Sequence, residues 1–228
     1  MDYFSQSLNS ALSLLFQFEP SIYFIIWTSL KISIIATFFA SIIAIPLGIL
    51  IAINQFFAKQ FLQQLLNTLM AMPTVMIGLI LYGFLSRKGL FGHYGLLYTE
   101  TAIILGEICL IVPIIINMTL TAIQSSDPRL LLTLKSLGAN QFQIFIPLLK
   151  ELKFVFLAII ITGFGRAIGE VGAAMMLGGN IHGSTRTLTT AIALETSKGA
   201  FETGLALGIA LLVIAFIVNF VLQKISPN

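Results

Sequence analysis

Charged residues are scarce in this 228-residue chain: they make up 9% of it, whereas hydrophobic residues make up 57%. A soluble domain usually carries about 25% charged residues. With so few charges, the chain cannot shield its apolar surface from water, which excludes a water-soluble globular fold. A bilayer makes no such demand, because its hydrocarbon core accepts apolar side chains directly. The composition therefore predicts a membrane protein.

Basic runs, cysteine pairs and histidine clusters are also missing. The twelve Lys and Arg residues are scattered, which excludes an electrostatic footprint for nucleic acid. The single cysteine, Cys109, excludes an internal disulfide. His93 and His182 lie far apart in the sequence, so we expect no metal site.

Motifs of catalysis and nucleotide binding are absent as well. The sequence has no His-Glu-x-x-His metal motif and no Gly-x-Ser-x-Gly nucleophile turn, which argues against an intramembrane enzyme. It has no Gly-rich Lys-Ser/Thr phosphate cradle, which argues against ATP binding by this chain itself. Residues 1–20 contain no Lys or Arg, and we therefore expect no cleavable signal.

Five long apolar segments are each long enough to cross a membrane, since a hydrocarbon core about 30 Å thick requires roughly 20 helical residues. The expected spans are residues 22–54, 62–85, 101–123, 154–177 and 203–223. We therefore expect an all-α fold, a polytopic membrane helical bundle of about five transmembrane helices that forms one domain over residues 22–223.

Small residues and prolines are expected to shape this bundle. Small residues at every fourth position let helices approach closely. The first span has such a stripe at Ala36, Ala40, Ala44, Gly48 and Ala52, and the fourth has one at Gly165, Gly169 and Ala173. A proline inside a span removes a backbone hydrogen bond and should kink its helix, which applies to Pro46, Pro73 and Pro113.

Lys and Arg residues in the loops predict the orientation. With the N-terminus outside, the inner side holds Lys59, Arg129, Lys135, Lys150, Lys153 and Lys224, and the outer side holds Arg87, Lys88, Arg186 and Lys198. Because the inner side is the richer one, we expect residues 1–21 to lie outside and the tail 224–228 to lie in the cytosol.

The one sizeable polar stretch, residues 124–153, is predicted to form two short helices joined by a turn. Asp127 is a good N-cap, and Pro128 suits the first helical position. Gly138 suits a left-handed stop, and Asn140 can cap the second helix. The residues alone leave two interpretations, an amphipathic connector at the membrane surface or a dock for a soluble partner.

This stretch resembles the coupling loop of binding-protein-dependent ABC importer permeases. In that family the loop reads Glu-Ala-Ala, three residues, then Gly, and it docks into a groove on the ATPase subunit. This chain keeps Gly138 but has Leu-Thr-Leu in place of Glu-Ala-Ala. The resemblance implies that the residues coupling the chain to an ATPase are Leu132, Thr133, Leu134, Gly138 and Ala139.

Longer stretches resemble the permeases of molybdate and tungstate importers. They are residues 72–78 (MPTVMIG), 86–92 (SRKGLFG) and 165–173 (GRAIGEVGA). Residues 178–199, which begin GGNI and end in TTAIALETSKG, are most similar to the tungstate branch. The resemblance covers nearly the whole chain from about residue 22.

This resemblance implies the permease subunit of a type I ABC importer that moves a tetrahedral oxyanion, most similar to the tungstate importers, with molybdate and sulfate as alternatives. The implied partners are two copies of an ABC ATPase, which would hold ATP and magnesium, an extracytoplasmic oxyanion-binding protein, a second copy of the chain and membrane lipid. The chain itself would hold no cofactor and would be a multi-pass protein of the cytoplasmic (inner) membrane.

An ion-coupled secondary transporter is the alternative from another functional class. Such transporters often show internal repeats or paired interrupted helices at the middle of the membrane. The sequence shows neither pattern.

Arg166 and Glu170 are four residues apart in the fourth span and so share a helix face. An ionisable residue in the bilayer needs a partner or water. Either this pair is a salt bridge that fixes packing, or Arg166, Gly169 and Glu170 belong to the anion path or its gate. Glu107, in the third span, is expected to face Arg166 or the second copy of the chain.

Residues 183–190 carry five hydroxyl groups around Arg186, and we expect a helix to begin there. One interpretation is that the hydroxyl groups cap this helix. The other is an anion-friendly outer vestibule, or a dock for a binding protein, lined by Thr185, Arg186, Thr189 and Thr190.

Overall fold

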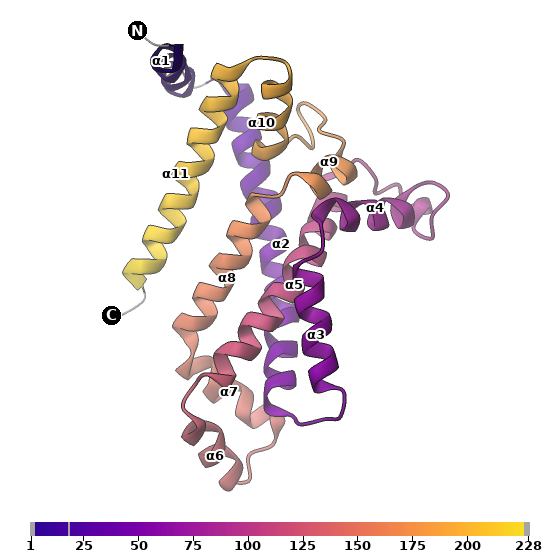
Figure 1. The fold of residues 1–228 in the computed structure, drawn as a ribbon, viewed down its shortest axis with the longest axis vertical. Helices are drawn as coiled ribbons and strands as arrows, with labels where there is room; N and C mark the ends of the chain where they lie inside the picture. Colours follow the sequence, from indigo (N-terminus) through magenta and orange to yellow (C-terminus); the bar gives the residue numbers. More distant parts are fainter. Residues whose placement is uncertain (1–2, 18, 226–228) are drawn as a thin grey trace.

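The computed structural model describes residues 3–17 and 19–225, which form helices joined by turns and loops. The longest helix, α2 (Pro20–Ile53), runs the length of the molecule, and α5 (Glu100–Gln124) packs along it (Figure 1). Two further helices, α8 (Lys153–Ile168) and α11 (Phe201–Ile225), complete the bundle. Of the expected tail 224–228, residues 226–228 lie outside the described part.

The contact between α2 and α5 forms where the small-residue stripe of the first span predicts it. Ala36, Ala40 and Ala44 have no exposed surface. A Cβ atom on Gly48 would lie 2.7 Å from the Cβ of Thr119 on α5, so this approach requires glycine. The stripe is therefore confirmed as a helix-packing surface.

The stripe predicted for the fourth span is wrong in two of its three residues. Gly165 and Gly169 are exposed, whereas Gly163 is buried and packs against Ile115 of α5. Gly163 and Ala167 are four residues apart and share the face of α8 that meets the bundle. Gly165 lies two residues away from each of them and therefore on a different face.

Two of the five expected spans are interrupted. Residues 59–85 form α3 (Lys59–Met70) and α4 (Thr74–Leu85), which meet at 96°, and the fourth span consists of α8 and α9 (Gly172–Gly178), which meet at 60°. Pro73 ends the first half-span, because proline disfavours helical geometry in the residue before it. Within residues 3–17 and 19–225, three helices are long and apolar enough to cross a membrane, or five segments if each bent pair counts as one span.

The span 62–85 breaks at Pro73, where the sequence predicts a kink, whereas no break is predicted within 154–177, where the structure has one. Together the two breaks correct the inference drawn from an absence of paired interrupted helices, because two such pairs lie within the described residues. Because secondary transporters often contain interrupted helices, this feature does not distinguish the chain from that class.

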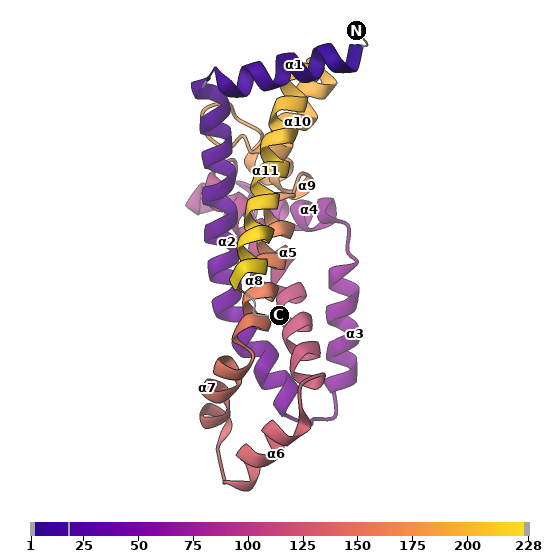
Figure 2. The ribbon, with the colours of Figure 1, turned by 90° about the vertical axis from the view of Figure 1, so that its left-hand side faces the viewer.

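The two ends of the molecule carry different short helices. The helix α1 (Tyr3–Phe16), which the sequence did not predict, lies across one end, near α10 (Leu188–Ser197) and the start of α11 (Figure 2). The opposite end holds α6 (Pro128–Ser136) and α7 (Gln141–Glu151). A single 3-10 turn, η1 (Gly92–Tyr94), lies between α4 and α5.

The local signals in residues 124–153 are confirmed. The Asp127 carboxylate accepts a hydrogen bond from the Arg129 backbone N–H at 2.8 Å, and α6 begins at Pro128. Gly138 adopts a left-handed conformation with a φ of +74°. Asn140 and Gln143 form a reciprocal capping box at the start of α7.

Candidate functional site

Arg166 and Glu170 meet at the break between α8 and α9. The Nη1 atom of Arg166 donates to Oε2 of Glu170 at 2.9 Å, and the backbone N–H of Ala173 donates to Oε1 at 2.9 Å. The hydroxyl group of Thr189, on α10, donates to the Glu170 carbonyl oxygen. The buried side chain of Glu170 therefore joins both halves of the interrupted span, and its backbone carbonyl oxygen holds α10 against them.

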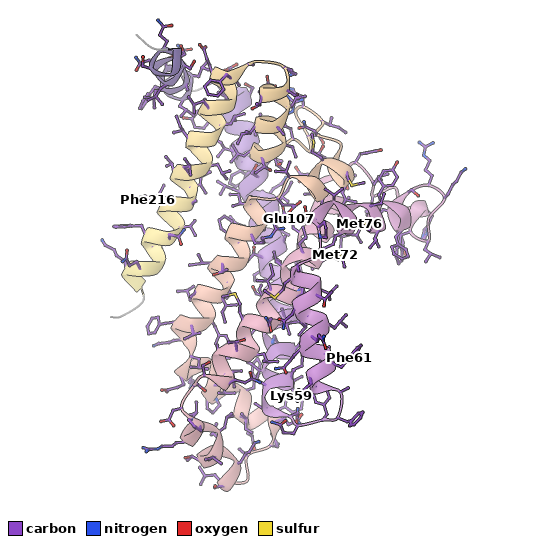
Figure 3. The ribbon with its side chains drawn as sticks, viewed as in Figure 1. Lys59, Phe61, Met72, Met76, Glu107 and Phe216 are labelled. Atoms are coloured by element: carbon purple, nitrogen blue, oxygen red, sulfur yellow. The ribbon has the colours of Figure 1, made fainter. Side chains whose placement is uncertain are left out.

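Glu107 on α5 lies near the middle of the bundle (Figure 3). Its buried carboxyl group interacts with Ser33 of α2 and is within electrostatic range of Arg166 and Glu170. Among the described residues, its Oε2 atom has no hydrogen-bond partner. Of the two expected neighbours of Glu107, Arg166 is thus present within the same chain. The Arg166 guanidinium group is paired with Glu170, and Glu107 lies nearby without forming an ion pair.

The second halves of the two interrupted spans, α4 and α9, pack against each other. A Cβ atom on Gly172 would lie 2.8 Å from Cγ2 of Val75, and one on Gly78 would lie 3.0 Å from the Cα of Ala173. Glycine at both positions lets the two backbones approach this closely. The α4 helix points sideways out of the bundle (Figure 1), and Met72 and Met76 lie at its root (Figure 3).

Sequence reasoning missed this junction, although two signals for it were present. Pro73 marks the first break, and the two glycines Gly169 and Gly172 flank the second. Gly169 itself is the exposed C-cap of α8 and borders a groove of about 250 Å³ between α8 and α11. Gly169 therefore faces this groove, whereas the side chain of Glu170 is buried on another side.

The threonines expected to line an outer vestibule are buried. Thr185, Thr189 and Thr190 are at most 6% exposed. Their hydroxyl groups donate to the backbone carbonyl oxygens of Gly178, Glu170 and Thr187, respectively. The vestibule prediction is therefore corrected for these three residues, because their hydroxyl groups pack and cap, and are not presented to solvent.

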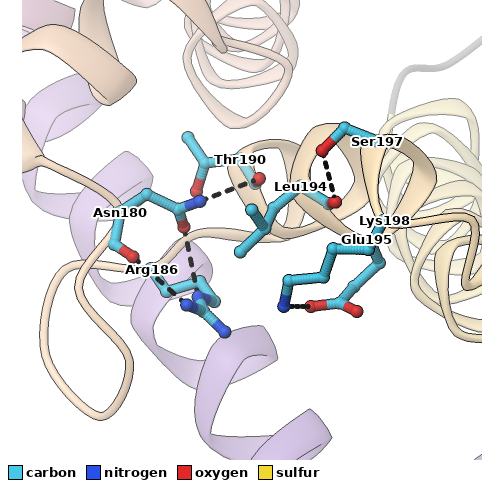
Figure 4. Close-up of polar contacts among 7 residues, drawn as sticks. All are labelled: Asn180, Arg186, Thr190, Leu194, Glu195, Ser197 and Lys198. Carbon is cyan, nitrogen blue, oxygen red and sulfur yellow. Dashed lines mark hydrogen bonds and ion pairs between the residues drawn. The ribbon is translucent and has the colours of Figure 1, made fainter.

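Arg186, the fourth residue of that prediction, is partly exposed but tethered. Its Nε atom donates to Oδ1 of Asn180 at 3.2 Å, and Nη2 donates to the Asn180 carbonyl oxygen at 3.3 Å (Figure 4). Asn180 has a φ of +51°, and its side-chain amide donates to the Thr190 carbonyl oxygen. The guanidinium group is thus held at a fixed place near the start of α10.

A second cationic feature lies in the loop after α4. Arg87 and Lys88 border a cleft of about 530 Å³, together with Tyr82, Ser86 and Tyr98. The hydroxyl groups of Tyr82 and Tyr98 lie 3.4 Å apart, and the hydrogen bond between them raises the pKa of Tyr98. None of the ion pairs formed by described residues includes Arg87 or Lys88. The cleft therefore presents uncompensated positive charge.

The predicted coupling residues divide between two faces of α6 and its turn. Leu132, Thr133 and Gly138 are exposed, whereas Leu134 and Ala139 pack partly against the bundle core. Ile144 and Leu148 of α7 are buried in that core. The apolar side chains that face outward are Leu132, Leu137, Phe142 and Ile146, which are 58–87% exposed. The α6–α7 pair is thus anchored on one face and apolar on the opposite one.

Comparisons with known proteins agree with this arrangement. Residues 44–228 match the family of binding-protein-dependent transport system inner membrane components. The chain is 38% identical to the tungstate uptake system permease protein TupB of Peptoclostridium acidaminophilum over 100% of both chains. It is also 38% identical to TupB of Campylobacter jejuni, over 99% of this chain and 95% of that one. Identity to the molybdenum transport system permease protein ModB of Escherichia coli is 24%, over 88% and 94%.

A solved structure of the MetNI methionine ABC transporter, in an inward-facing conformation, has a similar fold. The TM-score is 0.72 at 19% sequence identity, over 91% of this chain and 96% of that one. The bundle and its interrupted spans thus form the fold of a type I ABC importer permease. From the family match and the full-length relatives, the chain belongs to the inner membrane components of binding-protein-dependent transport systems.

Proposed function

We propose that this chain is the membrane-spanning subunit of an ATP-driven importer that carries tungstate into the cell. The observation that carries this proposal is the 38% identity, over essentially the full length, to two permeases named for tungstate uptake in different organisms. Identity to a molybdenum permease is lower, at 24%. Molybdate and sulfate remain the alternatives within the family.

The working importer needs partners. We propose two ABC ATPase subunits, which hold ATP and magnesium, an extracytoplasmic oxyanion-binding protein and a second copy of this chain in the cytoplasmic membrane. The absence of a phosphate cradle from the sequence supports a separate ATPase. Exposed apolar side chains on the sideways-pointing α4, among them Leu79, Ile80 and Phe84, support a second protomer on that side.

The outward face of α6 and α7 is the proposed dock for the ATPase. Its exposed leucines and Phe142 form an apolar surface at the end of the molecule, beyond the bundle. Arg129, Lys135 and Lys150 belong to the same helices, and basic residues favour the cytosolic side. We therefore propose that α1, at the opposite end, lies on the extracytoplasmic side, with the N-terminus outside.

Arg166 is the proposed centre of the gate. It is bonded to Glu170 in this conformation, and Glu107 offers a second carboxyl group nearby. When α8 and α9 change their mutual angle, Arg166 exchanges one carboxyl partner for the other or for the anion. A guanidinium group beside the path lowers the free-energy barrier to passage of an oxyanion, which apolar walls alone would exclude.

Uptake into proteoliposomes tests the proposed function. The chain is reconstituted with its ATPase and binding protein, and tungstate entry is measured with ATP, with a non-hydrolysable ATP analogue, and with ionophores that abolish ion gradients. We expect entry only with hydrolysable ATP and no effect of the ionophores. Entry driven by an ion gradient without ATP would instead establish a secondary transporter. Competition by molybdate and sulfate then ranks the substrates.

A further inference from the structure

Three side chains from three different elements converge on the last residues of α2. The ammonium group of Lys59, at the start of α3, donates to the carbonyl oxygens of Ala52 at 3.0 Å and Asn54 at 2.9 Å. Lys135, on α6, donates to the Ile53 carbonyl oxygen at 3.4 Å. Gln141, the first residue of α7, donates to Oδ1 of Asn54 at 2.9 Å.

The end of α2 is a place where such donors are stabilising. The last carbonyl groups of a helix have no partner within it, and they form the negative end of the helix dipole. Lys59 is only 8% exposed, and none of the ion pairs among described residues includes it. A buried ammonium group persists only where hydrogen bonds replace its water, and these carbonyl groups supply them.

The same end of α2 is where the coupling helices join the bundle. Ile144 and Leu148 of α7 pack in one core cluster with Ile49 and Ile53 of α2. Lys59 lies at this end of the molecule in Figure 3. Polar bonds from α6 and α7 and apolar contacts from α7 thus reach the same turn of α2.

Two routes lead from this turn toward the gate. The 34 residues of α2 rise about 51 Å, and near its other end Ser29 accepts a 2.6 Å hydrogen bond from the Leu188 N–H at the start of α10. The second route is α3, which leads directly to the break before Pro73. A displacement of the end of α2 therefore has a connected path to both interrupted spans.

We propose that Lys59, Lys135 and Gln141 form a clamp on the end of α2 that transmits movement of α6 and α7 to α2 and α3. Lys59 keeps α2 and α3 together, and Lys135 and Gln141 attach the coupling helices to them. All three are positioning residues, since the proposal gives them no contact with the anion. The proposal rests on the ATP-driven function above.

The test separates attachment of the ATPase from transmission of its movement. The double variant Lys135→Met/Gln141→Ala removes the two exposed members of the clamp and leaves the core intact. The readouts in the reconstituted full complex are the amount of ATPase subunit that co-purifies and the number of anions moved per ATP hydrolysed. Lys153→Met, which removes an exposed cation at the start of α8, outside the clamp and the proposed dock, is the matched control. The single substitution Lys135→Arg, which keeps a cation at this position and leaves Gln141 unchanged, is the conservative variant.

We expect the double variant to bind the ATPase normally and to hydrolyse ATP, while the ratio of anions moved to ATP hydrolysed falls at least threefold. The control and the Lys135→Arg variant should keep the native ratio. A native ratio in the double variant would overturn the clamp, and so would loss of ATPase binding, which would indicate docking instead. If the native complex moves no anion when ATP is supplied, the proposed function is wrong. That result is obtained before any variant is compared, so it is distinct from a failure of the clamp.

Lys59→Met gives a second arm, because methionine keeps a similar apolar chain and removes only the ammonium group. We expect the same loss of coupling, together with a lower unfolding temperature. Should this variant fail to fold, the double variant alone decides, since its two residues are exposed and make no core contact through their polar groups.

Discussion

Gly78 of α4 lies so close to Ala173 of α9 that a Cβ atom on Gly78 would come within 3.0 Å of the Ala173 Cα. The two interrupted spans therefore meet backbone to backbone, just beyond their breaks. A contact of this kind has little room to slide, because the packed interior resists small changes of volume. We infer that α4 and α9 change position together.

A larger side chain at Gly78 is expected to separate the two half-spans. In Gly78→Val the added atoms would also meet Met176, and overpacking of this kind costs about 1–3 kcal/mol. Anion uptake should fall at least fivefold, with a lower unfolding temperature in detergent. Gly83→Val is the matched control, because Gly83 is on the same helix and has open space around its Cα. Equal behaviour of the two variants would show that the contact is unimportant.

Removing Arg166 is expected to stop uptake, because Glu170 would lose its ion-pair partner and Glu107 a nearby cation. Arg166→Ala leaves buried carboxyl groups uncompensated, so a lower unfolding temperature is expected as well. The double variant Arg166→Ala/Glu170→Gln separates packing from transport, because the glutamine amide oxygen can still accept from the Ala173 N–H. Removing both charges should restore much of the stability, and uptake should stay low if Arg166 belongs to the path.

Lys198→Ala is the control for this pair. It breaks the Lys198–Glu195 ion pair, whose nitrogen and oxygen atoms are 2.9 Å apart on the surface of α10 (Figure 4). Exposed pairs contribute about 0–1 kcal/mol, so neither stability nor uptake should change much. Full uptake by a correctly folded Arg166→Ala protein would rule out a role for Arg166 in the path.

Reversing the charge of Arg186 is expected to slow uptake severalfold at low anion concentration. Arg186→Glu replaces a tethered cation near the start of α10 by a carboxylate, which repels an approaching oxyanion. The effect should weaken at high salt, because screening reduces long-range interactions between exposed charges. Asn180→Ala removes the tether and keeps the charge, so its uptake should show the native salt dependence. An unchanged rate in Arg186→Glu would remove this residue from the entry route.

Substitution of Gly138 is expected to weaken coupling without unfolding the bundle. Its φ of +74° disfavours any residue with a Cβ atom by about 1–2 kcal/mol, although no atom blocks the space around it. Gly138→Val should therefore reduce co-purification of the ATPase, whereas Gly138→Asn should be tolerated, since asparagine enters this region more readily. Gly165→Ala, in an open helical position, serves as the control and should bind the ATPase normally.

Features that depend on near neighbours in the chain could be predicted from the sequence. Asp127, Gly138 and Asn140 were assigned correctly, because a cap or a left-handed turn involves residues only two to four positions away. The existence of apolar helices was equally accessible, since it follows from composition over some twenty residues.

Features that depend on direction in space could not be predicted in this way. A hydropathy pattern reports the length of an apolar segment and is blind to a 96° bend within it. Glycines four residues apart indicate a helix face without large side chains, but they do not indicate which element packs against that face. For this reason the prediction that Gly165 and Gly169 pack inside the bundle was wrong. The nearness of Glu107 to Arg166 requires α5 and α8 to be packed first, and no short-range signal encodes it.

The shortness of α3 has a consequence for the surroundings of the protein. Its 12 residues rise about 18 Å, which is well short of the ~30 Å hydrocarbon core, and the chain then turns aside into α4. Arg87 and Lys88, which follow α4, are thus delivered to the flank of the molecule and not to its tip. Acyl chains cannot solvate the two charged side chains, so we expect this flank to lie at the lipid head groups, beside trapped water or against another polypeptide.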